Sequence, residues 1–338
     1  MDEATAQAWR ERVLAVEAEL NRILLGQSAV IRQCLICLLA RGHVLLEGDV
    51  GVGKTTLLRA LARSLGGGFA RVEGSIDMTP ADLVYHTFIS DQGRPQVEPG
   101  PLLAHDEALS VFFFNEINRA RPQVQALLLR AMAEGSITAF NREYRLPYLL
   151  AFADRNRVER GETFELAAAT RDRFMMELRV RIPGSQADRA SLVFDPVFHD
   201  VDRLIDSVTP GQLAFDRLPD LARDIQTRVS ASPALRDYAV RLMDATRLPA
   251  DHAVELDGYD MNTLVEAGAS PRGMSLMMRA ARVRAFLEGR DYLVPEDIGA
   301  VFADAIAHRI FFDPVHEFAR ESLARDFTAA VLARVAAP

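Results

Sequence analysis

The feature that most constrains this chain is a glycine-rich loop between a short apolar run and a helix-like segment. The loop has the sequence Gly48-Asp49-Val50-Gly51-Val52-Gly53-Lys54-Thr55-Thr56. Its glycines permit positive φ and let backbone N–H groups converge on phosphate oxygens. A helix that begins at the end of the loop adds partial positive charge at its N-terminus. The spacing and the strand–loop–helix context are those of a phosphate-binding P-loop.

Two side chains of this loop have a defined chemistry at such a site. Lys54 is expected to reach the β- and γ-phosphates, and the Thr55 hydroxyl is expected to ligate Mg²⁺. The alternative is a glycine-rich turn that contains a lysine by chance. Because many constraints are met together, this alternative is the weaker interpretation. The sequence therefore predicts a nucleoside triphosphate site, with ATP and Mg²⁺ as its ligands.

Composition and charge limit the classes of function. Hydrophobic residues make up 49% of the 338 residues, which is typical of a globular protein. The formal net charge of −8 argues against a general attraction to nucleic acid or anionic lipid, although a local basic pore remains compatible with it. No apolar run is long enough to span a bilayer, and the charged start of the chain does not resemble a signal peptide. We therefore expect a cytoplasmic protein.

The two cysteines, Cys34 and Cys37, have the spacing CxxC within an apolar segment that is expected to be helical. A zinc site would need two further ligands nearby, and a redox pair would lie at a strand-to-helix junction. Neither condition is met. We expect both cysteines to be small buried residues on one face of a helix.

Five short apolar runs bounded by turn residues predict buried parallel strands. They are residues 44–47, 69–73, 111–114, 149–153 and 175–180. With helices between them, such strands form a doubly wound α/β sheet that binds ligands at the carboxyl ends of its strands. After residue 184 the strand signals end and only helical patterns follow. We therefore predict a nucleotide-binding α/β core over residues 1–184 and an all-α domain over residues 185–338.

Two segments within the core have the pattern of β-hairpins. One surrounds residues 91–94, and the other surrounds residues 141–142. They either contact a client or merely cover a sheet edge or a neighbour, and the sequence leaves both possibilities open. Neither has the aromatic-plus-glycine pattern of proteins that thread their substrates, which favours remodelling or activation of a partner.

A P-loop enzyme that hydrolyses ATP needs acidic groups at the end of a neighbouring strand. One carboxylate orients Mg²⁺, usually through water, and an adjacent one polarises the attacking water. The run 111–114 is followed by Asn115 and Glu116. Glu116 fits the second role. Asn115 occupies the metal-orienting position, where its amide oxygen accepts a hydrogen bond but supplies no negative charge.

The segment Asn115-Glu116-Ile117-Asn118-Arg119-Ala120 resembles the Walker B region of the MoxR branch of AAA+ ATPases, which typically has Asp-Glu-Ile-Asn-Arg-Ala. The resemblance covers most of the chain. It includes Gly26 and Gln27 ahead of the P-loop, residues 121–128, and the sensor 2-like segment Gly268-Ala269-Ser270-Pro271-Arg272. It implies an AAA+ core with a helical lid, assembled in a ring, as a hexamer, with ATP bound between subunits.

The same resemblance assigns roles to single residues. Gly26 and Gln27 would join the nucleotide site. Asn156 matches the sensor 1 asparagine, which orients the attacking water or contacts the γ-phosphate. Arg173, in Asp172-Arg173-Phe174, matches an arginine finger that acts on the ATP of a neighbouring subunit. Arg272 matches the sensor 2 arginine of the lid. For each of these side chains, a solvated or salt-bridged surface position is the alternative.

The chain also departs from the family pattern. Asn115 replaces an aspartate, Val50 stands where proline is common, and Arg155 and Arg157 flank the sensor 1 position. Arg171 precedes the Asp-Arg-Phe segment, where leucine is usual. These departures concern turnover more than nucleotide binding. We therefore expect weak Mg²⁺-dependent hydrolysis.

The leading hypothesis is a MoxR-like ATPase with a chaperone-like role that remodels, assembles or activates client proteins. The resemblance implies a separate partner protein with a von Willebrand factor A domain, since this chain has no segment for one. The alternative is a nucleotide-gated scaffold that binds ATP and oligomerises with little hydrolysis, which Asn115 favours. A small-molecule kinase and a nucleic-acid motor are disfavoured by the motifs and by the acidic charge.

Overall fold

The structure is a computed structural model that describes residues 1–49, 51–155, 164 and 166–338. The chain forms two compact units. The core unit consists of Glu11–Arg173 and Leu178–Pro219, and the lid unit consists of Met1–Arg10, Phe174–Glu177 and Asp220–Pro338. No helix among the described residues is both long enough and apolar enough to cross a membrane.

These units are not bounded at residue 184, where the sequence pattern changes from α/β to helical. The reason lies in contacts of two short segments. Asp202 and Asp206 form ion pairs of 2.8 and 3.0 Å with arginines of the helix after the P-loop, so the segment after residue 184 belongs to the core unit. At the other end of the chain, Glu3 pairs with Arg228 of the lid unit. The sequence pattern carries no information on such contacts.

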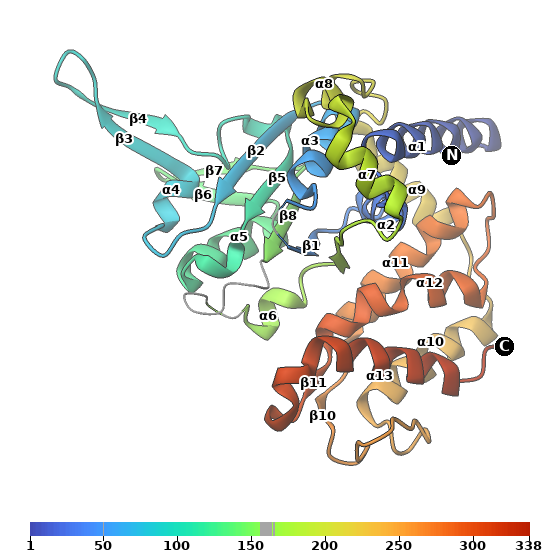
Figure 1. Cartoon of the computed structure of the whole chain (residues 1–338). Coiled ribbons are helices and arrows are strands. Elements are labelled where there is room, and N and C mark those ends of the chain that lie inside the picture. Colours follow the sequence, from blue (N-terminus) through green and yellow to red (C-terminus); the bar gives the residue numbers. More distant parts are fainter. Residues whose placement is uncertain (50, 156–163, 165) are drawn as a thin grey trace. The chain divides into compact units, whose positions relative to one another are not determined.

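The core unit is built around a five-stranded parallel sheet with the order β2-β5-β8-β1-β9 (Figure 1). The strands are β1 (Val44–Glu47), β2 (Gly68–Glu73), β5 (Leu109–Asn115), β8 (Leu150–Arg155) and β9 (Met176–Arg179). All five coincide with the apolar runs of the sequence to within two residues. The predicted α/β fold with a doubly wound sheet is confirmed.

The central strands are held by large apolar side chains. Phe112, Phe113 and Phe114 of β5 are all completely buried, and the rings of Phe112 and Phe114 meet edge to face with centroids 6.3 Å apart. Successive side chains of a strand point to opposite faces of its sheet, so both faces of β5 are covered. This explains why the strand is a continuous apolar run rather than an alternating one.

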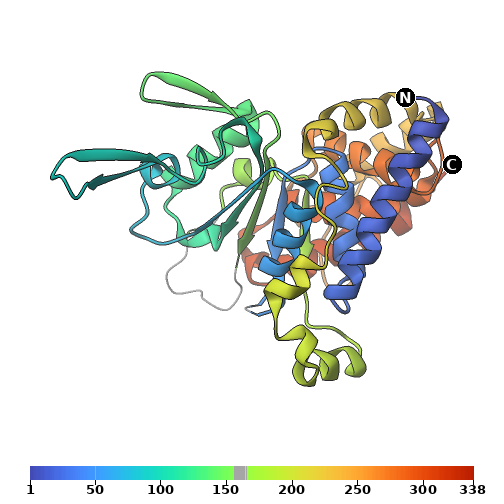
Figure 2. The ribbon, with the colours of Figure 1, turned by 90° about the horizontal axis from the view of Figure 1, so that it is seen from above.

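Helices cover both faces of this sheet. They are α1 (Glu3–Ile23, which begins in the lid unit), α2 (Ser28–Leu39), α3 (Lys54–Leu65), α4 (Pro80–Val84), α5 (Pro122–Glu134), α6 (Ala168–Arg171), α7 (Gln186–Phe194) and α8 (Val201–Asp206). Helices α3 and α5 lie on opposite faces (Figures 1 and 2). This placement follows from right-handed crossovers, because the chain moves across the sheet in opposite directions after β1 and after β5. Cys34 and Cys37 are buried in α2, as expected.

Both predicted hairpins are present and project from the sheet (Figure 2). The first pairs β3 (Tyr85–Ile89) with β4 (Pro95–Pro99), and the second pairs β6 (Ser136–Ala139) with β7 (Arg142–Arg145). The rings of Tyr85 and Phe140 lie 4.9 Å apart, so the two hairpins touch each other near their bases.

The lid unit is mainly helical, as the sequence predicts. Its helices are α9 (Leu218–Arg228), α10 (Pro233–Arg247), α11 (Pro271–Leu287), α12 (Pro295–Ile306) and α13 (Arg320–Arg334). Arg309, which is buried, donates hydrogen bonds of 2.6 and 3.3 Å to the carbonyls of Phe174 and Met175, so the segment between these residues and Glu177 belongs to this unit.

One part of the lid differs from the all-α prediction. β10 (Val265–Ala267) and β11 (Phe311–Phe312) form a two-stranded antiparallel ladder in which Val265 lies opposite Phe312. Strands of three and two residues are too short to show a periodic pattern, so the sequence gives no signal for them.

The burial of β5 predicts a large effect of truncation in its core. We expect Phe114→Ala to lower the free energy of unfolding by about 3–5 kcal/mol, because it leaves a cavity in a filled layer. The matched control is Phe194→Ala on α7, whose side chain is 80% exposed and which we expect to change stability by less than about 0.5 kcal/mol. Urea unfolding measures both, and equal effects would contradict this account of the core.

Candidate functional site

The loop between β1 and α3 has the backbone conformation that a P-loop requires. Gly51 and Gly53 have φ angles of 80° and 89°, in the region that favours glycine. Gly53 is the N-cap of α3 and no side chain caps the helix there. The N-terminal N–H groups of α3 are therefore directed at the space in front of the loop, where they bind an anion. Val50, which the resemblance includes in the site, lies outside the described residues.

Gly48, the first glycine of the loop, is required by a close backbone approach. A Cβ atom at this position would lie 2.4 Å from the carbonyl oxygen of Val180. The N–H of Val180 donates a 2.8 Å hydrogen bond to the carbonyl of Glu47, which fixes this end of β1 against the segment after β9. A side chain at Gly48 therefore cannot be accommodated without moving one of the two strands.

Lys54 is buried and closes the loop on itself. Its ammonium donates hydrogen bonds to the carbonyls of Gly48 and Asp49, at 2.6 and 3.3 Å. It also forms an ion pair of 2.9 Å with Asp154 Oδ2. Each of these contacts orients the charge toward the carboxyl ends of the central strands, so the lysine is positioned before any phosphate binds.

Glu116 follows β5 in an unusual backbone conformation. Its φ and ψ angles of 54° and 49° are left-handed, which is costly for a residue other than glycine, asparagine or aspartate. Its Oε2 lies 3.0 Å from Arg119 Nη1 in the turn that begins at Ile117. Its N–H donates to Asp154 Oδ1 at 2.5 Å. Strained residues concentrate at functional sites, which agrees with a catalytic role for this carboxylate.

Asp154 is a site residue that the sequence motifs did not identify. It lies at the carboxyl end of β8, its side chain is 1% exposed, and it contacts both Lys54 and the backbone of Glu116. Burial raises the pKa of this carboxyl, and the charge of Lys54 opposes the shift. The signal was available: an acidic residue directly follows the apolar run 149–153, at the sheet edge where ligands bind.

These groups face one polar cavity of about 370 Å³. Its lining includes Gly51, Val52, Gly53, Lys54, Thr55 and Thr56 of the loop together with Asn115, Glu116 and Asp154 at the strand ends. The donors fit a triphosphate, because backbone N–H groups and a buried ammonium converge here. The acceptors fit Mg²⁺, which binds oxygen ligands and keeps several waters. The predicted metal-site residues, Thr55 and Asn115, are thus brought together in one cavity.

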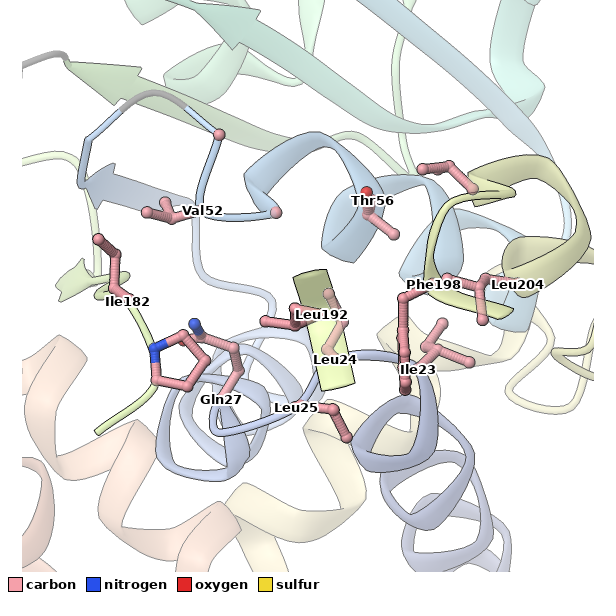
Figure 3. Close-up of a pocket in the computed structure, with 14 residues that line it drawn as sticks. Ile23, Leu24, Leu25, Gln27, Val52, Thr56, Ile182, Leu192, Phe198 and Leu204 are labelled. Atoms are coloured by element: carbon pink, nitrogen blue, oxygen red, sulfur yellow. The ribbon is translucent and has the colours of Figure 1, made fainter. Parts of the chain in front are cut away.

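A second cavity, of about 310 Å³, lies on the other side of the loop (Figure 3). Gly51, Val52, Gly53 and Thr56 line both cavities. The remaining lining is mostly apolar, with Leu24, Leu192 and Phe198 around it (Figure 3). An apolar cavity next to a phosphate-binding loop is suited to a nucleotide base.

Gln27 lines the apolar cavity, and Gly26 lies directly before it. Gln27 donates a hydrogen bond of 2.6 Å from Nε2 to the carbonyl of Arg181. At Gly26, with φ 69°, a Cβ would lie 2.7 Å from Pro183 Cβ. Gly26 therefore allows the loop before α2 to pack on the segment after β9, which places Gln27 in the wall of the cavity.

The three other residues with assigned roles, and Arg157, lie away from these contacts or outside the described residues. Asn156 and Arg157 lie outside the described residues. Arg173, directly before the lid segment at Phe174, is half-buried and donates a 2.8 Å hydrogen bond to the carbonyl of Ala169. Arg272 is exposed in the first turn of α11 in the lid unit.

Two of the arginines that depart from the family pattern are not surface residues. Arg155 forms an ion pair of 3.1 Å with the buried Glu47, and Arg171 is itself buried. The expectation that both are ordinary surface arginines is wrong for Arg171, whose side chain is 7% exposed.

Comparison with known proteins agrees with this geometry. Residues 43–176 match the ATPase family associated with various cellular activities (AAA), and residues 259–326 match the AAA lid domain. The chain is 57% identical to Protein MoxR of Methylorubrum extorquens over 330 residues, which cover 98% of this chain and 96% of that protein. It is a member of the MoxR family of AAA+ ATPases.

Two further comparisons extend this assignment. Chaperone MoxR1 of Mycobacterium tuberculosis is 35% identical over 298 residues, covering 86% of this chain and 74% of that protein. The crystal structure of a proposed ATPase from Cytophaga hutchinsonii superposes with a TM-score of 0.86 at 27% identity, covering 99% of this chain and 98% of that one. The MoxR-family fold therefore extends over both units.

The contact at Gly48 predicts a specific sensitivity of the loop. We expect Gly48→Ala to weaken nucleotide binding and to lower the free energy of unfolding by about 1–3 kcal/mol, because its methyl group would overlap the Val180 carbonyl. The control is Gly184→Ala, since a Cβ there meets no atom within 4 Å. Fluorescent-ADP titration and thermal unfolding measure both variants. Normal nucleotide affinity in Gly48→Ala would contradict the described approach of the two segments.

Proposed function

We propose that this MoxR-family protein hydrolyses ATP between the subunits of a hexameric ring and uses the cycle to remodel or activate partner proteins. The observation that carries the proposal is the single polar cavity in which the P-loop, Lys54 and Glu116 meet. Binding groups and a candidate base are thus on one side of the same space. Action in the cytoplasm is part of the same proposal.

The residues of the cavity divide the chemistry among them. The loop N–H groups and Lys54 hold the phosphates and stabilise charge on the transferring group. Glu116 polarises the attacking water, and Asn156 orients it or contacts the γ-phosphate. Thr55 and Asn115 face Mg²⁺, which when bound neutralises charge on the phosphates. Release of Glu116 from Arg119 would precede its action on water, because one carboxylate oxygen is held in that ion pair.

A complete site needs a positive charge that these residues do not supply. In the part of the chain that the structure describes, Arg173 is among the lining residues of neither cavity. This supports its assignment as a finger that reaches the ATP of a neighbouring subunit. Arg272 of the lid is proposed to contact the γ-phosphate.

The hairpins are the proposed contact surface for a protein client or for a separate partner with a von Willebrand factor A domain. Ile89, Val97 and Phe140 have side chains that are 75%, 54% and 53% exposed. Exposed apolar side chains that gather on projecting elements are typical of protein-binding surfaces. A chaperone-like role also agrees with the name of the mycobacterial relative.

A second candidate function is a scaffold that binds ATP and assembles with little hydrolysis. Asn115 favours it, because the side chain at the metal-orienting position carries no charge. Mass measurement in solution with and without ATP and Mg²⁺, coupled to phosphate release, separates the two. Assembly without release favours the scaffold, and assembly with release favours the ATPase.

The assignment of Glu116 predicts a separation of binding from turnover. We expect Glu116→Gln to lower the rate of phosphate release by about 10²–10⁴-fold, because the amide cannot accept the proton of water. Affinity for ATP should remain near that of the native protein. Glu134→Gln, at the exposed end of α5, is the matched control and should leave the rate unchanged. Comparable rates in the two variants would remove Glu116 from the mechanism.

The trans role of Arg173 is tested by mixing two inactive variants. Arg173→Ala subunits keep a complete cavity, and Glu116→Gln subunits keep the finger. In a ring of equal parts, about a quarter of the interfaces would combine the intact halves, because each interface is formed head to tail by two subunits. We expect phosphate release to reappear on mixing. Continued inactivity, with mixed assembly verified by mass, would show that Arg173 is not a finger acting in trans.

A further inference from the structure

We infer that Asp154 supplies the carboxylate that position 115 lacks, and that it positions the waters of a bound Mg²⁺. The inference rests on the proposed function, since it concerns the metal of the ATP site. It makes Asp154 a positioning residue, because it acts through water held by the metal rather than on the phosphate itself.

The register of the sheet places Asp154 beside Asn115. β5 and β8 are parallel neighbours, and Phe114 pairs with Ala153. The next position is Asn115 on one strand and Asp154 on the other, and residues at matching positions of parallel neighbours face the same side. A carboxylate at 154 is therefore displaced from one at 115 by a single strand spacing, about 4.8 Å. The displacement is toward β1 and the P-loop, because β8 lies between β5 and β1.

The contacts of Asp154 hold its carboxylate in one orientation. Oδ2 pairs with Lys54 and Oδ1 accepts the N–H of Glu116. An ionised carboxylate has about four positions for accepting hydrogen bonds, so these two contacts leave capacity for water. The group also lines the polar cavity with Asn115 and Glu116. It is thus both fixed and still able to accept from a metal-bound water.

The charge of the site is consistent with this role. With aspartate at position 115, the family pattern gives two adjacent carboxylates at the end of β5. In this chain Glu116 and Asp154 again give two, and Asn115 lies beside both. Burying a carboxylate is costly unless it is paired, and Lys54 pairs with Asp154 in the unliganded site. Bound Mg²⁺ would supply further positive charge at the same place.

The two carboxylates beside Asn115 define the controls. Asp154 could serve only to neutralise Lys54, without any effect on the metal. Alternatively, Glu73 could be the compensating carboxylate, because it pairs with Asn115 from the opposite side, on β2. Glu73, however, forms an ion pair of 3.3 Å with Arg71 and its side chain is 62% exposed. Asp154 and Glu73 thus flank Asn115 on both sides but differ in burial.

The test measures metal binding directly, with Mn²⁺ as the probe and EPR detection of free Mn²⁺ in the presence of ADP. We expect Asp154→Asn to weaken Mn²⁺ binding by about 10–100-fold, as loss of an outer-shell partner does. Affinity for fluorescent ADP in EDTA should not fall, because no metal is then involved. The exchanged variant Asn115→Asp/Asp154→Asn should recover most of the Mn²⁺ affinity. Phosphate release should follow the same order.

A second variant leaves Asp154 in place and therefore does not depend on the folding of Asp154→Asn. If Asp154 already serves the metal, Asn115→Asp alone should change Mn²⁺ affinity by no more than about twofold. If no carboxylate serves it, Asn115→Asp should strengthen binding by about 10–100-fold. That gain would overturn the inference. So would full Mn²⁺ affinity in a folded Asp154→Asn variant, failure of the exchange to restore binding, or the loss appearing in Glu73→Gln instead.

Failure of the inference and failure of the proposed function have different signatures. A native protein that neither binds ATP with Mg²⁺ nor releases phosphate contradicts the proposed ATPase. A native protein that does both, with Mn²⁺ affinity unaffected by Asp154→Asn, contradicts only the role of Asp154.

Discussion

The ion pair between Lys54 and Asp154 is the interaction on which the arrangement of the site depends. It joins the first residue of α3 to the end of the central strand β8, with both side chains nearly inaccessible to solvent. Breaking a buried pair by removing one partner costs about 3–5 kcal/mol, because a charge is then left unpaired. Lys54 also holds the carbonyl of Gly48. One charged contact therefore fixes the loop, the helix and the sheet edge relative to one another.

The same carboxylate explains how Glu116 tolerates a left-handed backbone. Asp154 accepts the Glu116 N–H, and the neighbouring Gly74 leaves room that no side chain could, since a Cβ there would lie 2.2 Å from the Glu116 carbonyl oxygen. Strain at a functional residue persists only where the surroundings determine it. The conformation of Glu116 is thus imposed by its neighbours on β8 and after β2, and the motif around it does not account for it alone.

Apolar runs and glycine spacing were sufficient to predict the sheet, the P-loop and the hairpins, because burial on both faces and positive φ each leave a local signature. The parts that were missed depend on contacts between distant segments. Asp154 follows a predicted strand, yet its role depends on Lys54, which is a hundred residues away. The attachment of α8 to α3 and the short ladder of β10 and β11 likewise follow from tertiary contacts. Neither has a periodic pattern that a sequence can show.

These observations bear on how a departure from a sequence motif is interpreted. Considered along the chain, Asn115 is the loss of a charge from the Walker B segment. Considered across the sheet, Asn115 and Asp154 are adjacent positions on the same face, so charge at one can replace charge at the other. What the metal and the attacking water require is a carboxylate at the sheet edge, and parallel strands offer that edge from several separate segments. An altered motif therefore predicts slow turnover only where none of the neighbouring strand ends supplies the missing charge.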